Sequence, residues 1–311
     1  MNELKLLREW DADAPPLTDA ARTRARFRLH QAMREPAAPM TISRRPLLRV
    51  AVAAVAAGTV TATVVVAQNT GSSPRTQPVS AATVLRGAAA EERRLEKPIA
   101  PRDDQFIYSK EIIKETPAGG GRTRTYVDES WSSVDGSKKS YLSELGDADW
   151  VPPFKPGESI WPPNRWSELK QLPTDPAKLP IALRGLLRKP DPDRPLRADE
   201  WPMVQFGLSG LLRKPVLPKG LRSAAFEALA TVPGIRLLPG RTDADGRTGL
   251  GIQYVGGPGT PWADRKQVLV FDAKTYQYLG MRDQRREGGT TYEQWSYLAV
   301  HGVVDRVMQR P

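Results

Sequence analysis

The chain has 311 residues, a formal net charge of +11 and a pI of about 9.9, and it contains no cysteine. The lack of cysteine excludes disulfides, thiolate catalysis, lipoprotein lipidation and cysteine-ligated zinc. The excess of positive charge would attract anionic lipid or cell-wall polymer.

Residues 1–45 predict a short helical head. An N-cap at Thr18 and Asp19 begins a helix that runs to about Met33. Two interpretations stay open: a basic helix that lies on the inner leaflet of a membrane, or a docking segment for a cytoplasmic protein. The residues of a docking face would be Arg22, Arg26, Leu29 and Met33.

Residues 46–67 predict one transmembrane helix. Their apolar part, residues 50–67, contains nothing more polar than three threonines. With the apolar residues before it, the segment reaches about 30 Å as a helix, the thickness of the hydrocarbon core of a bilayer. Residues 1–49 hold ten Lys and Arg against six Asp and Glu. Because positive charge stays in the cytoplasm, we expect the N-terminus inside and the C-terminus outside.

A cleaved export signal is the alternative to a retained anchor. Residues 43–49 (SRRPLLR) look like a twin-arginine motif, and residues 66–68 offer small side chains near a cleavage point. Against this interpretation, 42 residues precede the motif, and they look like organised structure. We therefore expect a protein of the cell membrane with a single span.

An outer domain is predicted over residues 81–311, after a flexible linker at residues 68–80 that is rich in Ser, Thr, Pro and Gly. The domain should begin with a helix over residues 81–95. The side chains expected to point inward from this helix are Val84, Leu85, Ala88, Ala89 and Leu95.

Strands follow this helix in the predicted order of elements. Alternating patterns predict strands over residues 105–114 and 122–134, joined at the turn formed by residues 119–121. A third strand is expected near residues 138–144.

A Trp- and Pro-rich insert comes next, at residues 149–175. Its proline density excludes the interior of a regular sheet. Two interpretations stay open: the aromatic side chains hold a Pro-rich loop against the sheet, or they line an apolar groove for a lipid or glycan. The residues of such a groove would be Trp150, Phe154, Trp161 and Trp166.

Helical patterns occupy about residues 177–232, and strands return after them. The later strands are expected over residues 235–238, 249–255, 267–272, 277–284 and 290–300. Strands, then helices, then hairpins without βαβ alternation predict an α+β fold with an antiparallel sheet and a helical insert. The complete expected architecture is an N-terminal cytoplasmic helix, one transmembrane helix and this extracytoplasmic domain.

No motif predicts a catalytic centre, a cofactor or a metal. The two histidines, His30 and His301, fall on opposite sides of the predicted membrane, so a triad outside would have to centre on His301. Residues 243–246 (DADG) look like the start of a calcium loop but lack the later oxygen ligands, and we interpret them as a hairpin turn. We therefore expect no enzyme activity and no cofactor.

Several segments together carry a family resemblance that covers most of the chain: residues 4–13, 20–33, 183–189 (LRGLLRK), 233–235, 243–249, 269–279 and 304–311. Through these segments the chain resembles an uncharacterised family of single-pass membrane proteins from high-GC Gram-positive bacteria. The resemblance implies an architecture like that of anti-sigma factors, in which a cytoplasmic head binds a sigma factor. By fold analogy, the outer domain also looks like lipoprotein carriers and sigma-regulator sensors.

We expect a non-enzymatic, membrane-anchored protein that binds or senses a ligand outside the cell and regulates a sigma factor through its head. Its partners would be the lipid bilayer, a cytoplasmic sigma factor, and lipid or cell-wall polymer outside, without direct nucleic acid binding. The alternative is an exported lipid- or cell-wall-binding protein whose twin-arginine-like signal is cleaved. A third hypothesis, a hydrolase, would depend on His301 or an acidic pair.

Overall fold

The computed structural model describes residues 79–311, except 156–157, 159, 188–193, 257–266 and 288. These residues form five helices: α3 (Ala81–Leu95), α4 (Trp166–Leu169), α5 (Leu179–Leu187), α6 (Trp201–Leu212) and α7 (Leu221–Leu229). They also form nine strands: β1 (Phe106–Pro117), β2 (Arg124–Ser133), β3 (Ser140–Glu144), β4 (Asp147–Val151), β5 (Ile235–Thr242), β6 (Thr248–Tyr254), β7 (Val268–Phe271), β8 (Tyr278–Glu287) and β9 (Thr290–Val304).

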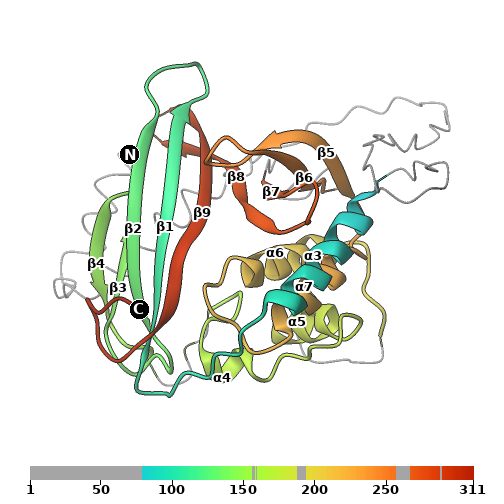
Figure 1. The fold of residues 1–311 in the computed structure, drawn as a ribbon. Coiled ribbons are helices and arrows are strands. Elements are labelled where there is room, and N and C mark those ends of the chain that lie inside the picture. Colours follow the sequence, from blue (N-terminus) through green and yellow to red (C-terminus); the bar gives the residue numbers. More distant parts are fainter. Residues whose placement is uncertain (1–78, 156–157, 159, 188–193, 257–266, 288) are drawn as a thin grey trace, which may run out of the picture.

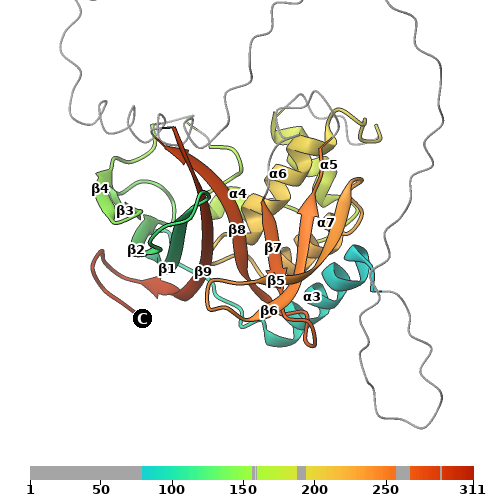
Figure 2. The ribbon, with the colours of Figure 1, turned by 90° about the horizontal axis from the view of Figure 1, so that it is seen from above.

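All nine strands join one antiparallel sheet in the order β4-β3-β2-β1-β9-β8-β7-β6-β5. The central pair is β1 with β9, so the first strand of the sheet lies beside the last one in the chain. Figures 1 and 2 show that the sheet is strongly curved and that the helices gather on one side of it, next to β5–β8. The strands on both sides of the helical segment in the sequence therefore form one continuous layer.

The larger hydrophobic core lies between the helices and the sheet. Ser80 begins α3 as its N-cap, because its hydroxyl oxygen accepts a hydrogen bond from the backbone N–H of Thr83 at 3.1 Å. The stripe of α3 that faces the core is fully buried, as its helical spacing predicts, and it consists of Val84, Leu85, Ala88 and Ala89. The sheet contributes Ile107, Ile252, Leu269 and Phe271 to the same core.

A second, smaller cluster covers the opposite face of β1. Successive side chains of a strand point to opposite faces, so Ile107 joins the larger core while Phe106 and Tyr108 join Trp131 and Val304. The C-terminal residues close this cluster. The indole N–H of Trp131 donates to the carbonyl oxygen of Gln309 at 2.6 Å, and Arg310 donates to both carboxylate oxygens of Glu129 at 2.7 Å.

The fold class expected from the sequence is wrong for the described residues. More of them lie in one nine-stranded antiparallel sheet than in helices, and the helical segment is not inserted between separate sheets, because β1 pairs with β9. The membrane and single-pass description needs correction as well. Within the described ranges no helix is both long and apolar enough to cross a membrane. The head at residues 1–45 and the span at residues 46–67 lie outside the described residues.

Candidate functional site

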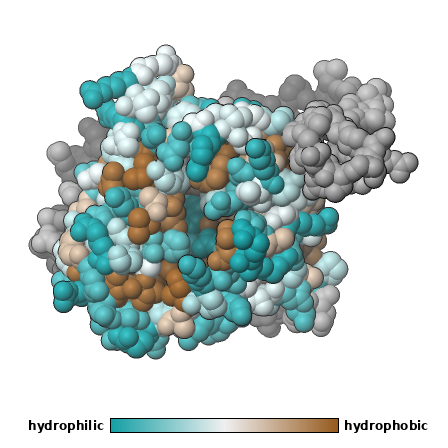
Figure 3. All heavy atoms as spheres, in the orientation of Figure 1, coloured by the Kyte–Doolittle hydropathy of each residue, from teal (hydrophilic) through white to brown (hydrophobic). Residues whose placement is uncertain are grey.

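A cleft of about 570 Å³ separates the helices from the sheet. Its walls are α3 and the segment from α6 to α7 on one side, and β1, β8 and β9 on the other. Figure 3 shows the surface hollowed between the two halves of the molecule, with apolar residues beside the hollow. The volume falls within the range of about 300–1,000 Å³ that is typical of small-molecule sites.

The lining of the cleft combines apolar and ionisable side chains. The apolar members are Ala88, Leu95, Ile99, Leu212, Pro215, Val216, Leu217, Phe226, Leu279, Met281 and Leu298. The charged and titratable members are Glu91, Glu92, Glu96, Lys97, Glu111, Arg213, Arg222, Tyr278, Tyr297 and His301. Such a site can hold an apolar body and orient a polar group.

A β-bulge turns two side chains of β9 toward the cleft. Glu111 of β1 lies opposite Leu298, but Lys110 lies opposite Val300, so Ala299 has no partner in the β1–β9 register. In an unbroken strand Leu298 and His301 would point to opposite faces. The extra residue reverses the alternation between them, and both therefore line the same cleft.

A glycine allows β8 to bend beside β9 at this point. Gly280 has a φ of +138°, and a Cβ there would lie 2.3 Å from the carbonyl oxygen of Ser296. Only glycine adopts this conformation without strain and leaves room for that oxygen. The β7–β8 register shifts next to it, where Val270 lies opposite Gly280 but Phe271 lies opposite Tyr278. The sheet wall of the cleft is thus shaped by one bulge on each of two neighbouring strands.

Three aromatic rings join the base of the cleft to the sheet. The ring of Phe226 on α7 lies 5.7 Å from that of Phe271 and 6.1 Å from that of Tyr278, and the latter two are 5.6 Å apart. Burial raises the pKa of Tyr278 well above its ordinary value, with the positive charges of Arg213 and Arg222 opposing the shift. The Tyr278 hydroxyl is therefore a neutral hydrogen-bonding group in the cleft at physiological pH.

Arg222 anchors the helical wall. Its Nη1 donates to the carbonyl oxygen of Leu212 at 2.8 Å, its Nη2 donates to that of Lys214 at 2.6 Å, and its Nε lies 3.2 Å from Glu92 Oε1. Burial lowers the pKa of Arg222 and raises the pKa of Glu92, and their mutual attraction opposes both shifts. This pair ties α3 to the segment before α7, and it occupies the charged groups of both residues.

A second acid, the C-cap residue of α3, serves the N-terminus of α7. Gly220 is the N-cap of α7 and has no side chain to accept a hydrogen bond, and Glu96 Oε1 accepts from its backbone N–H at 2.7 Å. A carboxylate at this end of a helix also interacts favourably with the helix dipole. Glu96 is therefore a capping group contributed by another helix.

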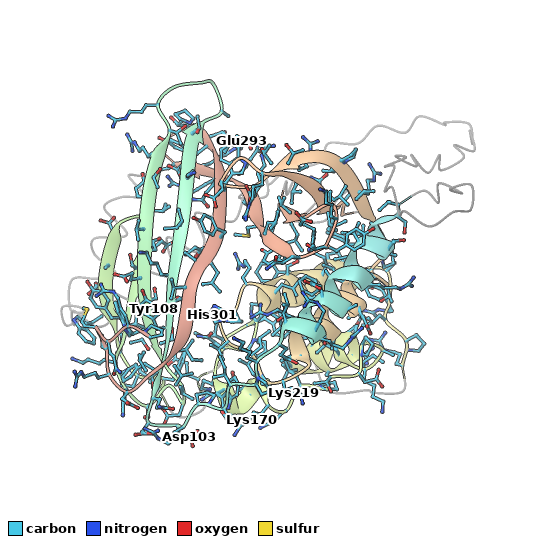
Figure 4. All side chains as sticks on the ribbon, viewed as in Figure 1. Asp103, Tyr108, Lys170, Lys219, Glu293 and His301 are labelled. Atoms are coloured by element: carbon cyan, nitrogen blue, oxygen red, sulfur yellow. The ribbon has the colours of Figure 1, made fainter. Side chains whose placement is uncertain are left out.

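His301 is the histidine of the cleft, and Figure 4 labels it on β9. Burial lowers its pKa, and the positive charge of Arg222 lowers it further. The imidazole is therefore mainly neutral at pH 7. Within the described part of the chain no group of three or more His, Cys, Asp and Glu side chains could hold a metal ion.

None of the four aromatic residues predicted to form a groove lines this cleft. Trp166 is 5% exposed and belongs to the larger core, and Trp161 packs against Gly207 of α6. Phe154 contacts the guanidinium of Arg165, 5.6 Å from its ring centroid. Trp150 is 45% exposed on β4. The structure does not gather them into one site, and the predicted docking residues Arg22, Arg26, Leu29 and Met33 lie outside the described residues.

Sequence reasoning missed the residues that do form the cleft. They come from six elements and the loops beside them, which are far apart in the chain, from Ala88 to His301. One local signal existed: Leu298, Ala299 and Val300 are three consecutive apolar residues, which interrupt the alternation of the strand pattern just before His301. That irregularity is consistent with a bulge but does not show which surface faces it.

Comparisons with known proteins leave the family open. No protein-family profile and no curated protein matches the chain. Among solved structures, a LolA superfamily protein from Nitrosomonas europaea matches at 11% sequence identity over 74% of this chain and 96% of that one, with a TM-score of 0.19. At this TM-score the similarity carries no argument about the chain described here.

Proposed function

We propose that this domain binds an amphipathic, lipid-like ligand in the cleft between the helices and the sheet, without chemical conversion. The observation that carries the proposal is an open cleft of about 570 Å³ with apolar side chains on both walls and ionisable groups among them. It corresponds to the lipid-binding alternative drawn from the sequence.

The apolar part of the ligand would lie between two exposed leucines. Leu95 at the end of α3 is 43% exposed and Leu298 on β9 is 36% exposed, and both line the cleft from opposite walls. Large apolar side chains in water carry a cost of about 25 cal/mol for each Å² of apolar surface. A hydrocarbon chain placed between them would remove that surface from water on both sides.

The ionisable groups would orient the ligand. Tyr278 offers a neutral hydroxyl, and His301 offers a mainly neutral imidazole beside the apolar walls. A few polar groups converging on an apolar pocket are the usual arrangement for orientation and specificity in small-molecule sites.

The test uses the full-length chain and N-phenyl-1-naphthylamine, an uncharged probe whose fluorescence rises in apolar surroundings. Leu298→Glu places a carboxylate on the apolar wall, and we expect it to weaken probe binding about tenfold or more because the charge must be desolvated. The matched control is Val300→Glu. Val300 is 42% exposed two residues further along β9 and does not line the cleft.

Probe binding that is absent in the unchanged chain would contradict the proposal. So would an equal loss in the two variants, because the loss would then reflect a general effect of charge on β9 rather than the cleft.

A further inference from the structure

Resting on this proposed function, we infer that the ligand is an anionic single-chain amphiphile, whose carboxylate or phosphate is bound by Arg213. Lys97 supplies a second positive charge at the rim. The inference follows from which charged groups of the cleft are already engaged by the protein itself.

The acids of the cleft have partners. Glu91 accepts two hydrogen bonds from Arg94, at 2.6 and 2.8 Å, and Glu92 forms the ion pair with Arg222. Glu96 accepts the hydrogen bond from the N-cap of α7. Glu111 takes part in a polar interaction as well. Carboxylates that are occupied in this way have little capacity left for a cationic ligand.

The basic residues of the cleft fall into two groups, one with partners in the described part of the protein and one without. Arg222 is held by Glu92 and by backbone carbonyl oxygens. Arg213 and Lys97 are both exposed, line the cleft, and form no ion pair or side-chain hydrogen bond with any other described residue. The charges that remain available to a ligand are therefore positive.

Arg213 is also the better placed of the two. It follows α6 as its C-cap, and its positive charge lowers the pKa of Tyr278 against the effect of burial. Arg213 and Tyr278 line the same cleft, so one anionic group bound there can meet both side chains. A guanidinium can donate two parallel hydrogen bonds to a carboxylate or phosphate, and a phenol can donate a third.

The experiment measures displacement of N-phenyl-1-naphthylamine from the full-length chain by three detergents with the same dodecyl chain, each below its micelle concentration. They are dodecyl phosphate, dodecyl maltoside and dodecyltrimethylammonium. We expect dodecyl phosphate to displace the probe at about a tenfold lower concentration than dodecyl maltoside, and the cationic detergent to be the weakest. Inorganic phosphate should displace nothing, because it lacks the chain.

Arg213→Gln should reduce the preference for dodecyl phosphate over dodecyl maltoside to about threefold or less, with each displacement measured relative to the variant's own affinity for the uncharged probe. The matched control is Arg286→Gln, an exposed arginine on β8 that does not line the cleft, which changes the net charge equally. That variant should keep the preference.

Different outcomes would contradict the anionic amphiphile and the proposed function. Equal displacement by all three detergents, a preference that survives in Arg213→Gln, or displacement by inorganic phosphate would overturn the anionic amphiphile. Failure of the unchanged chain to bind the uncharged probe would overturn the proposed function itself.

Discussion

The two faces of β1 are covered in opposite ways. On one face Tyr108 and Trp131 pack at 5.2 Å between ring centroids, and the C-terminal residues close the cluster with hydrogen bonds. On the other face Ser109 and Glu111 meet the helices only across a cleft. Figure 4 labels Tyr108 at the closed side and His301 at the open one. One strand thus supports a sealed cluster for stability and an open surface for binding, and each can be altered separately.

The largest effect should come from the sealed side. Trp131→Ala removes a side chain that is 1% exposed, and we expect a loss of about 3–5 kcal/mol in the free energy of unfolding because a large cavity remains. Urea unfolding followed by circular dichroism measures it. Probe binding should be unchanged where the variant is folded.

The control for that variant is Trp150→Ala, which changes the same residue type where it is 45% exposed. It should cost less than about 1 kcal/mol. Equal losses in the two variants would show that the cluster does not have the stabilising role assigned to it.

A medium effect should come from the open side. Gly280→Ala places a Cβ 2.3 Å from the carbonyl oxygen of Ser296 at a φ of +138°, and we expect a loss of about 2–3 kcal/mol with weaker probe binding, because β8 must move. Gly246→Ala has a φ of +80° and no described atom within 4 Å of the new Cβ, and should cost about 1 kcal/mol without affecting the probe. Unchanged probe binding in Gly280→Ala would show that binding in the cleft does not depend on the bulge of β8.

The smallest effect should depend on pH. The Arg310 guanidinium lowers the pKa of Glu129 from 4.5 to about 2, so their contact stabilises the folded state above pH 4.5 and loses that effect as pH falls toward 2. Arg310→Gln should therefore lower the urea midpoint at pH 7, with a difference from the unchanged chain that shrinks below pH 4.5.

The control for the pH series is Arg86→Gln, an exposed arginine of α3 that has no ion pair with another described residue. Its small effect should not vary with pH in this way. A difference between Arg310→Gln and the unchanged chain that stays constant from pH 7 to pH 3 would rule out Glu129 as the partner that matters.

Elements with strong local patterns were predictable. The helix expected over residues 81–95 is confirmed as α3, and the strands on either side of the glycine turn are confirmed as β1 and β2. Leu95 differs from the expectation, because it ends the helix at the cleft and stays 43% exposed. Of the five residues predicted to point inward from this helix, only Leu95 is exposed, and it lies beside the open cleft.

Short or irregular segments were less predictable. The proline density of the Trp- and Pro-rich insert excluded the interior of a sheet, and its beginning belongs to β4, an edge strand that ends at Val151 just before two prolines. That short edge strand was not predicted. The four-residue helix α4 lies in the same insert. Segments this short carry too few residues for a period to show.

The sequence by itself determined the local elements, because helical and alternating periods are properties of neighbouring residues. Only the tertiary structure decided that β1 pairs with β9, that a bulge at Ala299 turns Leu298 and His301 to the same side, and that α3 stands across from them. These contacts join residues almost two hundred positions apart. Their free energy comes from packing of the whole sheet against the helices, which no local pattern records.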